Sequence, residues 1–93
     1  MTRKRSKLEI YLDILRAIRR GVSKPTRIMY RTNLSWIPLQ KIFESMVSQD
    51  LLREIEENKR KEYTITEKGK NVLRYFDQMM DLMKIEYETA ESL

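Results

Sequence analysis

The sequence contains no cysteine and no histidine, and it has only two glycines and two prolines. Without cysteine or histidine, the chain cannot form a disulfide, a zinc knuckle, or a site for thiol or imidazole catalysis. Gly21 and Gly69 are too far apart to build a phosphate-binding loop of the GxGxxG or P-loop kind. The acidic residues have no base or metal ligand to pair with them. We therefore expect no catalytic residue, no metal and no cofactor.

Long apolar segments are also missing. No run approaches the roughly 20 residues that cross a membrane, and the basic N-terminus lacks the apolar segment of a signal peptide. These absences predict a cytoplasmic, non-enzymatic protein without membrane contact. The length of 93 residues suits one small domain with an adequate core.

Positive charge is concentrated near the start of the chain. The formal net charge is +5, but residues 1–31 alone hold ten Lys and Arg against two acidic residues, a local charge of +8. Residues 67–93 hold four basic and six acidic side chains, a local charge of −2. This asymmetry indicates an anionic partner at one end of the molecule and a different role for the other end.

Apolar residues spaced by three and four predict helices in the first half of the chain. The first helix runs from a Ser6 cap to Gly21, which can take the left-handed conformation that ends a helix. The second is short, with Ser23 as its cap and Pro25 in its first turn, and it stops near Thr32.

Ser35 opens a third predicted helix after a tight corner. Trp36, Ile37 and Pro38 give this helix an apolar and stiff first turn, because proline loses no hydrogen bond there. Its inward-facing positions follow offsets of three and four, and they are Leu39, Ile42, Phe43, Met46 and Val47.

After residue 50 the pattern changes to two short strands. Residues 51–56 and 62–66 are predicted strands, the second with a clear alternation of side chains. The charged connection 57–61 lies between them, and Asn58 is the residue in it best suited to a positive φ.

A last helix begins at a Thr66 cap and is predicted to continue uninterrupted to about Glu91. It would be too long for so small a domain to cover. Its apolar residues step by three and four, the spacing of a coiled-coil seam. The predicted dimer interface consists of Leu73, Phe76, Met80, Met83 and Tyr87.

This order of elements is that of a winged helix-turn-helix domain with a long C-terminal dimerisation helix, which is a mostly α (α+β) fold. The segments SKLEIYLDILRAI, TRIMYRTNLS and YTITEKGK resemble a family of small crenarchaeal winged-helix DNA-binding proteins, chromatin-type proteins and predicted transcriptional regulators. The second segment is quite specific to that family. The third is shared with many winged-helix regulators, so it identifies the fold better than the family.

The resemblance implies a nucleoid-associated homodimer that binds double-stranded DNA as a transcriptional regulator or an architectural chromatin protein. Residues 1–66 would be the DNA-binding domain with a basic N-terminal arm, and residues 67–93 an antiparallel coiled coil. The third helix would enter the major groove, and the hairpin wing would touch the flanking backbone. Ile37 and Pro38 stand where that family has polar and basic residues, which argues against hydrogen-bonded base readout at this helix tip.

Candidate DNA contacts come from the arm, the second and third helices, and the wing. Lys41 is expected on a phosphate, because a single ammonium reads sequence poorly and phosphates receive most contacts. Arg60 is best suited to a narrow minor groove. The full set is Arg3, Lys4, Arg5, Lys7, Arg27, Tyr30, Arg31, Ser35, Trp36, Gln40, Lys41, Lys59, Arg60 and Lys61.

Several alternatives stay open on the sequence alone. Trp36 and Ile37 can press on sugar or thymine-methyl surface, or Trp36 can pack against the hairpin or a neighbouring helix. The wing cations can equally form a solvated turn. For the whole protein, a protein-interaction module and an RNA-binding protein are the alternatives to a DNA-binding protein.

Overall fold

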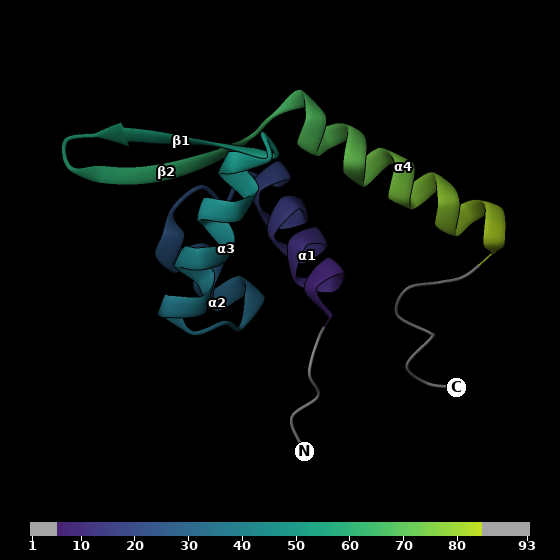
Figure 1. The fold of residues 1–93 in the computed structure, drawn as a ribbon, viewed down its shortest axis with the longest axis horizontal. Helices are drawn as coiled ribbons and strands as arrows, with labels where there is room; N and C mark the ends of the chain where they lie inside the picture. Colours follow the sequence, from purple (N-terminus) through teal and green to yellow (C-terminus); the bar gives the residue numbers. More distant parts are fainter. Residues whose placement is uncertain (1–5, 85–93) are drawn as a thin grey trace, which may run out of the picture.

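The computed structural model describes residues 6–84. Helices α1–α3 pack together, and the hairpin and the last helix extend from them in opposite directions (Figure 1). The fold confirms the predicted mostly α architecture with a hairpin and a long C-terminal helix. The elements in order are α1 (Lys7–Arg19), α2 (Pro25–Thr32), α3 (Trp36–Ser48), β1 (Leu52–Glu57), β2 (Arg60–Ile65) and α4 (Glu67–Met83).

The ends of α1 are stabilised as the sequence predicts. The Ser6 hydroxyl accepts a hydrogen bond from the Glu9 N–H at 3.1 Å, and the Glu9 carboxylate accepts one from the Ser6 N–H at 3.4 Å. This capping box satisfies two N–H groups that have no partner within the helix. At the other end, Gly21 takes a φ of 101°, which turns the chain toward α2.

The connection before α2 differs from the prediction, because Ser23 does not cap the helix. Lys24 occupies the N-cap position and makes no side-chain cap hydrogen bond. The Ser23 hydroxyl instead donates to the Glu62 carboxylate at 2.7 Å, and the Ser23 carbonyl accepts the Tyr63 N–H at 2.9 Å. A long-range contact with the hairpin has therefore replaced the local one. Pro25 does stand at the start of α2, as predicted.

The hairpin has a shorter turn than the sequence predicts, and its second strand begins two residues earlier. Asn58 and Lys59 alone form the turn, with φ values of 53° and 63°, the conformation of a two-residue type I′ turn. The predicted connection 57–61 is therefore wrong in extent: Arg60 and Lys61 lie in β2, opposite Glu57 and Glu56 of β1. The predicted positive φ at Asn58 is confirmed.

One apolar core joins all these elements. Phe43 of α3 stacks on Tyr63 of β2, with ring centroids 4.0 Å apart and an angle of 16° between the planes. Around this pair lie the other buried apolar residues of the core: Leu12, Ile14, Leu15, Ile18, Ile28, Leu39, Met46, Leu51, Leu52 and Leu73. The burial of Leu39, Phe43 and Met46 confirms the inward face predicted for the third helix.

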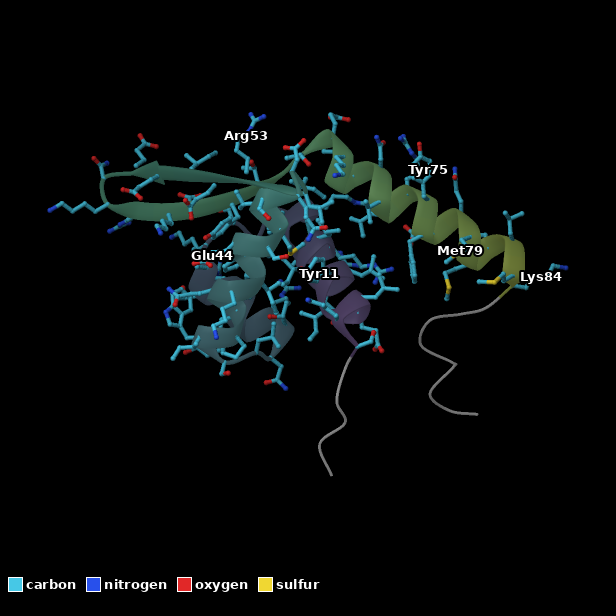
Figure 2. All side chains as sticks on the ribbon, in the orientation of Figure 1. Tyr11, Glu44, Arg53, Tyr75, Met79 and Lys84 are labelled. Carbon is cyan, nitrogen blue, oxygen red and sulfur yellow. The ribbon has the colours of Figure 1, made fainter. Side chains whose placement is uncertain are left out.

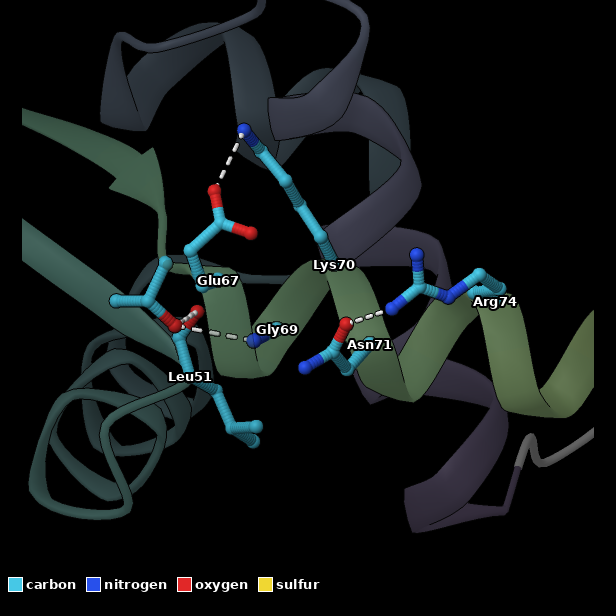
Figure 3. A network of polar contacts seen from close by, with 7 residues as sticks. Leu51, Glu67, Gly69, Lys70, Asn71 and Arg74 are labelled. Carbon is cyan, nitrogen blue, oxygen red and sulfur yellow. Dashed lines mark hydrogen bonds and ion pairs between the residues drawn. The ribbon is translucent and has the colours of Figure 1, made fainter.

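The start of α4 is held tightly against the chain that precedes the hairpin. The Thr66 hydroxyl accepts the Gly69 N–H at 3.0 Å, donates to the Asp50 carbonyl oxygen at 2.6 Å and lies 3.1 Å from the Leu51 carbonyl oxygen. Figure 3 shows Gly69 and Leu51 on the two sides of this contact. A Cβ on Gly69 would lie 2.4 Å from that same Leu51 oxygen and 2.8 Å from Cγ1 of Ile65. This close approach requires glycine.

The far end of α4 falls short of the predicted position. The helix ends at Met83, and Lys84 has a left-handed φ of 54°. The long helix is therefore present but does not run uninterrupted to Glu91, and Tyr87 lies outside the described residues. Within residues 6–84, no helix has the length and apolar character needed to cross a membrane.

The predicted coiled-coil seam is divided between two environments. Leu73 is completely buried in the core of a single chain, so its place in the predicted dimer interface is wrong. Phe76 and Met80 are partly buried, whereas Met83 is 51% exposed. The exposed apolar side of α4 therefore lies beside the predicted seam, and Tyr75, Met79 and Leu82 belong to it.

Gly69→Ala should lower the free energy of unfolding by about 1–3 kcal/mol, although alanine favours helix over glycine. The reason is that the added methyl group would meet a backbone oxygen, which cannot move aside as a flexible side chain can. Urea denaturation at one fixed protein concentration measures the change. Gln78→Ala, at an exposed position of α4, is the control and should stay within about 0.5 kcal/mol of wild type. A Gly69→Ala protein as stable as wild type would contradict the packing described here.

Candidate nucleic-acid interface

A cleft of about 560 Å³ separates α3 from the hairpin. Its lining includes the buried, stacked rings of Phe43 and Tyr63, which form its floor. The start of α2 closes one side of it. The polar, charged and remaining apolar lining comes from Lys24, Pro25, Thr26, Trp36, Gln40, Glu44, Glu54, Lys59, Arg60, Lys61 and Glu62.

Helix α3 presents two different exposed strips because its residues repeat every 3.6 positions. Trp36, Gln40 and Glu44 are four residues apart and form the α3 wall of the cleft; Glu44 lies beneath the hairpin in Figure 2. Ile37 and Lys41 are also four apart and lie on the side away from the buried residues of α3, and both are exposed. Neither residue of the second strip lines the cleft.

The cations of the hairpin lie near its tip. Lys59 is in the turn, and Arg60 and Lys61 follow in β2, where successive side chains leave opposite faces of the sheet. Lys61 lies 3.7 Å from the Glu54 carboxylate, in a half-exposed ion pair. Arg60 is exposed and has no ion pair among the described residues. Lys59 is likewise exposed and unpaired among the described residues, so Lys59 and Arg60 are the hairpin cations most available to an external anion.

Carboxylates offset much of this positive charge within the cleft. The Tyr63 hydroxyl donates to Glu54 at 2.9 Å, and Ser23 donates to Glu62 at 2.7 Å. Burial raises the pKa of Tyr63, and the hydrogen bond and the negative charge of Glu54 raise it further, with a smaller contribution from the charge of Glu44. Glu62 thus fastens the hairpin to the chain before α2 and Glu54 joins the two strands of the hairpin, while Glu44 makes no hydrogen bond or ion pair within the described residues.

This combination of an exposed helix, a cationic hairpin and a cleft between them matches a known family. The family model described as "Winged helix-turn-helix" matches residues 4–84. The chain belongs to the winged helix-turn-helix family. The hairpin formed by β1 and β2 is therefore the wing, and α3 occupies the position of the recognition helix.

Individual proteins are also similar to this chain over most of its length. The uncharacterized protein MJ0287 of Methanocaldococcus jannaschii is 34% identical over 80 residues, which is 86% of this chain and 78% of that protein. The crystal structure of Sso10a-2, a DNA-binding protein from Sulfolobus solfataricus, superposes with a TM-score of 0.74 at 30% identity, over 95% of this chain and 92% of that one. F93 from STIV, a winged-helix DNA-binding protein, shares the fold with a TM-score of 0.66 at 19% identity, over 83% of this chain and 91% of that one.

The structure gathers only some of the predicted DNA contacts around the cleft. Trp36, Gln40 and the three wing cations line it, and Lys41 lies on the neighbouring strip of the recognition helix. Trp36 is 39% exposed, so it is a wall residue that still presents part of its ring to solvent. Ser35 stands at the N-cap of α3 without a side-chain cap hydrogen bond.

Other predicted contacts lie farther from the cleft. The exposed α2 residues Arg27, Tyr30 and Arg31 are not part of its lining, and Lys7 lies beside the last part of α3, near Ser45 and Gln49. The three arm residues fall outside the described range: Arg3, Lys4 and Arg5.

Sequence reasoning missed the residues that attach the wing to the body. Lys24 lines the cleft, and Ser23 and Glu62 make the hydrogen bond that joins the wing to the chain before α2. Their only local signal was the serine before Pro25, which predicted a helix cap. The partners lie far apart in the chain, so nothing in the spacing of the sequence indicated these contacts.

Tyr63→Phe should reduce the loss of stability that alkaline pH causes. The folded winged helix binds the hydroxyl proton more tightly than the unfolded chain, whose tyrosine pKa is 10.0. This stabilisation is therefore fully present below pH 10 and is lost as the pH rises through the folded pKa. Above pH 10, the unfolding free energy of wild type should fall more steeply than that of Tyr63→Phe, by at most about 1.4 kcal/mol per pH unit.

The measurement is urea denaturation at a series of pH values. Tyr30→Phe, which removes a hydroxyl from an exposed ring, is the matched control and should keep the wild-type slope. Equal slopes for wild type and Tyr63→Phe would contradict the role given to this hydroxyl.

Proposed function

We propose that this protein is a homodimer that binds double-stranded DNA and acts as a transcriptional regulator or an architectural chromatin protein. The observation that carries the proposal is the exposed strip of α3 beside a wing whose tip holds three cations. The similarity to Sso10a-2, a DNA-binding protein at 30% identity, supports the same function for this chain.

In the proposed complex, α3 enters the major groove and the wing lies along the flanking backbone. The cleft between them would then face the sugar–phosphate strand that separates the two grooves. Lys41 of α3 and Arg60 of the wing would neutralise phosphates at the two edges of the cleft. Glu44 opposes the approach of phosphate to the middle of the cleft. Binding is the whole of the proposed mechanism, and each phosphate neutralised releases counterions, so affinity depends steeply on salt.

The proposed dimer forms through the exposed apolar side of α4. Tyr75 is 62% exposed, Met79 46%, Leu82 85% and Met83 51%, and all four occupy one side of the helix. This part of α4 projects beyond the packed body, where no other described element covers it (Figures 1 and 2). A second copy of the same helix would bury these side chains, and each side chain fully covered would stabilise the dimer by about 1.5–3 kcal/mol.

The dimer gives the two parts of the chain separate roles. Residues 1–66 would bind DNA, with the N-terminal arm on the backbone, and residues 67–93 would join the subunits. A two-fold axis through the paired helices would place the two copies of α3 on separate half-sites, and the length of α4 would set their spacing.

Lys41→Gln should weaken DNA binding by a similar factor for unrelated duplex sequences and make it less dependent on salt. If Lys41 neutralises one phosphate in each subunit, the slope of log affinity against log salt should become less negative by about 0.9 for each phosphate that is no longer neutralised. Fluorescence anisotropy of a labelled duplex over a salt series measures the slope. Lys70→Gln, which removes the same charge from an exposed position on α4, is the matched control and should leave it unchanged. The same slope in wild type and Lys41→Gln would remove Lys41 from the interface.

Met79→Lys should shift the dimer toward monomer by at least about tenfold in dissociation constant, because two desolvated ammonium groups would replace apolar contacts at the interface. Sedimentation equilibrium over a concentration series measures the constant. Asp81→Lys introduces the same side chain on the opposite side of α4, at another exposed position, and should leave the dimer intact. If wild type sediments as a monomer at all concentrations, the dimer part of the proposal is overturned.

A further inference from the structure

We propose that Ile37 recognises the C5-methyl group of thymine in the major groove, which makes it a specificity-determining residue. This inference rests on the proposed DNA-binding function and adds to it the chemical feature that α3 reads. It follows from where Ile37 lies, from the residues beside it, and from what the major groove offers to an apolar side chain.

Ile37 is the most exposed apolar side chain of α3. It is 65% exposed and lies on the side of the helix opposite the buried Leu39 and Phe43. It is in the first turn, and the N-terminal residues of a recognition helix are those that reach base edges. Lys41 lies one turn further along the same strip, where a phosphate contact would hold this strip against the DNA.

The other residues of the first turn do not compete for this role. Trp36 belongs to the wall of the cleft and faces the wing side of α3. Pro38 carries no N–H, and its ring holds the backbone of this turn in helical conformation. Leu39 is completely buried. Ile37 is therefore the side chain of this turn that is free to enter the groove ahead of Lys41.

The chemistry of the groove then limits what Ile37 can recognise. Isoleucine has no donor or acceptor, so it cannot distinguish bases by hydrogen bonding, and every base edge in the major groove except thymine presents only donors and acceptors. The thymine methyl is the apolar group of that surface, and covering it also covers Ile37. A single exposed isoleucine is ordinary on protein surfaces; this one lies at the start of the outward strip, one turn before the cation proposed to bind phosphate.

The test compares two duplexes that differ only in the methyl group. An alternating dA–dT duplex and the same duplex with dU in place of dT present identical donors and acceptors in the major groove. Fluorescence anisotropy at low salt should give about fourfold weaker binding to the dU duplex for each methyl group contacted, as expected for loss of one buried methylene-sized group. Because dU also changes duplex flexibility, a second pair compares alternating dG–dC with the same duplex carrying 5-methylcytosine, and the methylated duplex should bind more tightly.

Two substitutions assign the effect to a residue. Ile37→Ala should bind the dT and dU duplexes equally, while Ile37→Val, which keeps a branched side chain, should retain most of the discrimination. Ile55→Ala removes the same atoms from an exposed isoleucine of β1 and should keep the wild-type ratio. Lys41→Gln should weaken binding to both duplexes and leave their ratio unchanged. Circular dichroism verifies that each variant is folded.

The outcomes separate this inference from the function on which it rests. If wild type binds both duplexes of a pair equally well, or if Ile37→Ala keeps the wild-type ratio, methyl recognition by Ile37 is overturned and DNA binding stands. If wild type binds none of the duplexes even at low salt, the proposed function itself fails, and the exposed apolar turn belongs to a protein contact.

Discussion

The contact between Phe43 and Tyr63 is the constraint on which the candidate interface depends. This pair is the principal ring contact between α3 and the wing, and the stacked rings form the floor of the cleft between them. Tyr63 also donates its N–H to the Ser23 carbonyl and its hydroxyl to Glu54. These bonds hold β2 against the chain before α2 and against β1. The two surfaces that would meet one DNA duplex in the proposed complex are thereby fixed in a single geometry, so their spacing would not have to be restored on binding.

The charges of the wing have structural roles beside the proposed binding role. Glu62 attaches the wing to the body through Ser23, Glu54 joins the two strands of the wing through Tyr63, and both reduce the positive potential of the cleft. Lys61, which pairs with Glu54, is therefore partly neutralised, while Arg60 and Lys41 have no ion pair among the described residues. A DNA backbone would meet a surface that attracts it at two places and not in between. Such a pattern favours one register of the protein on the duplex more than a uniformly basic surface would.

Much of the fold could be predicted from the sequence because it depends on local patterns of residues. The offsets of three and four in α3, the capping box at Ser6 and the positive φ at Asn58 depend on neighbours in the chain. Two of the failures involve long-range contacts. Ser23 serves the wing and not α2, and Leu73 fits the spacing of a coiled-coil seam but is buried by α1 and the core. For the site, residue types on α3 and at the wing tip were enough to name its cations, whereas the carboxylates that shape the cleft could be recognised only once the strands were paired.

Thr66 is the sole residue between the end of β2 and the start of α4, and Gly69 brings the helix against the backbone of Leu51. Helix α4, which would join the two subunits, thus follows β2 of the wing with almost no flexible linker between them. In a dimer built through α4, a rotation of one subunit relative to the other would therefore move the wings by the same rotation. A difference between the spacing of the subunits and the helical repeat of the duplex would then require the DNA to bend, because no flexible linker between the wing and α4 could accommodate it.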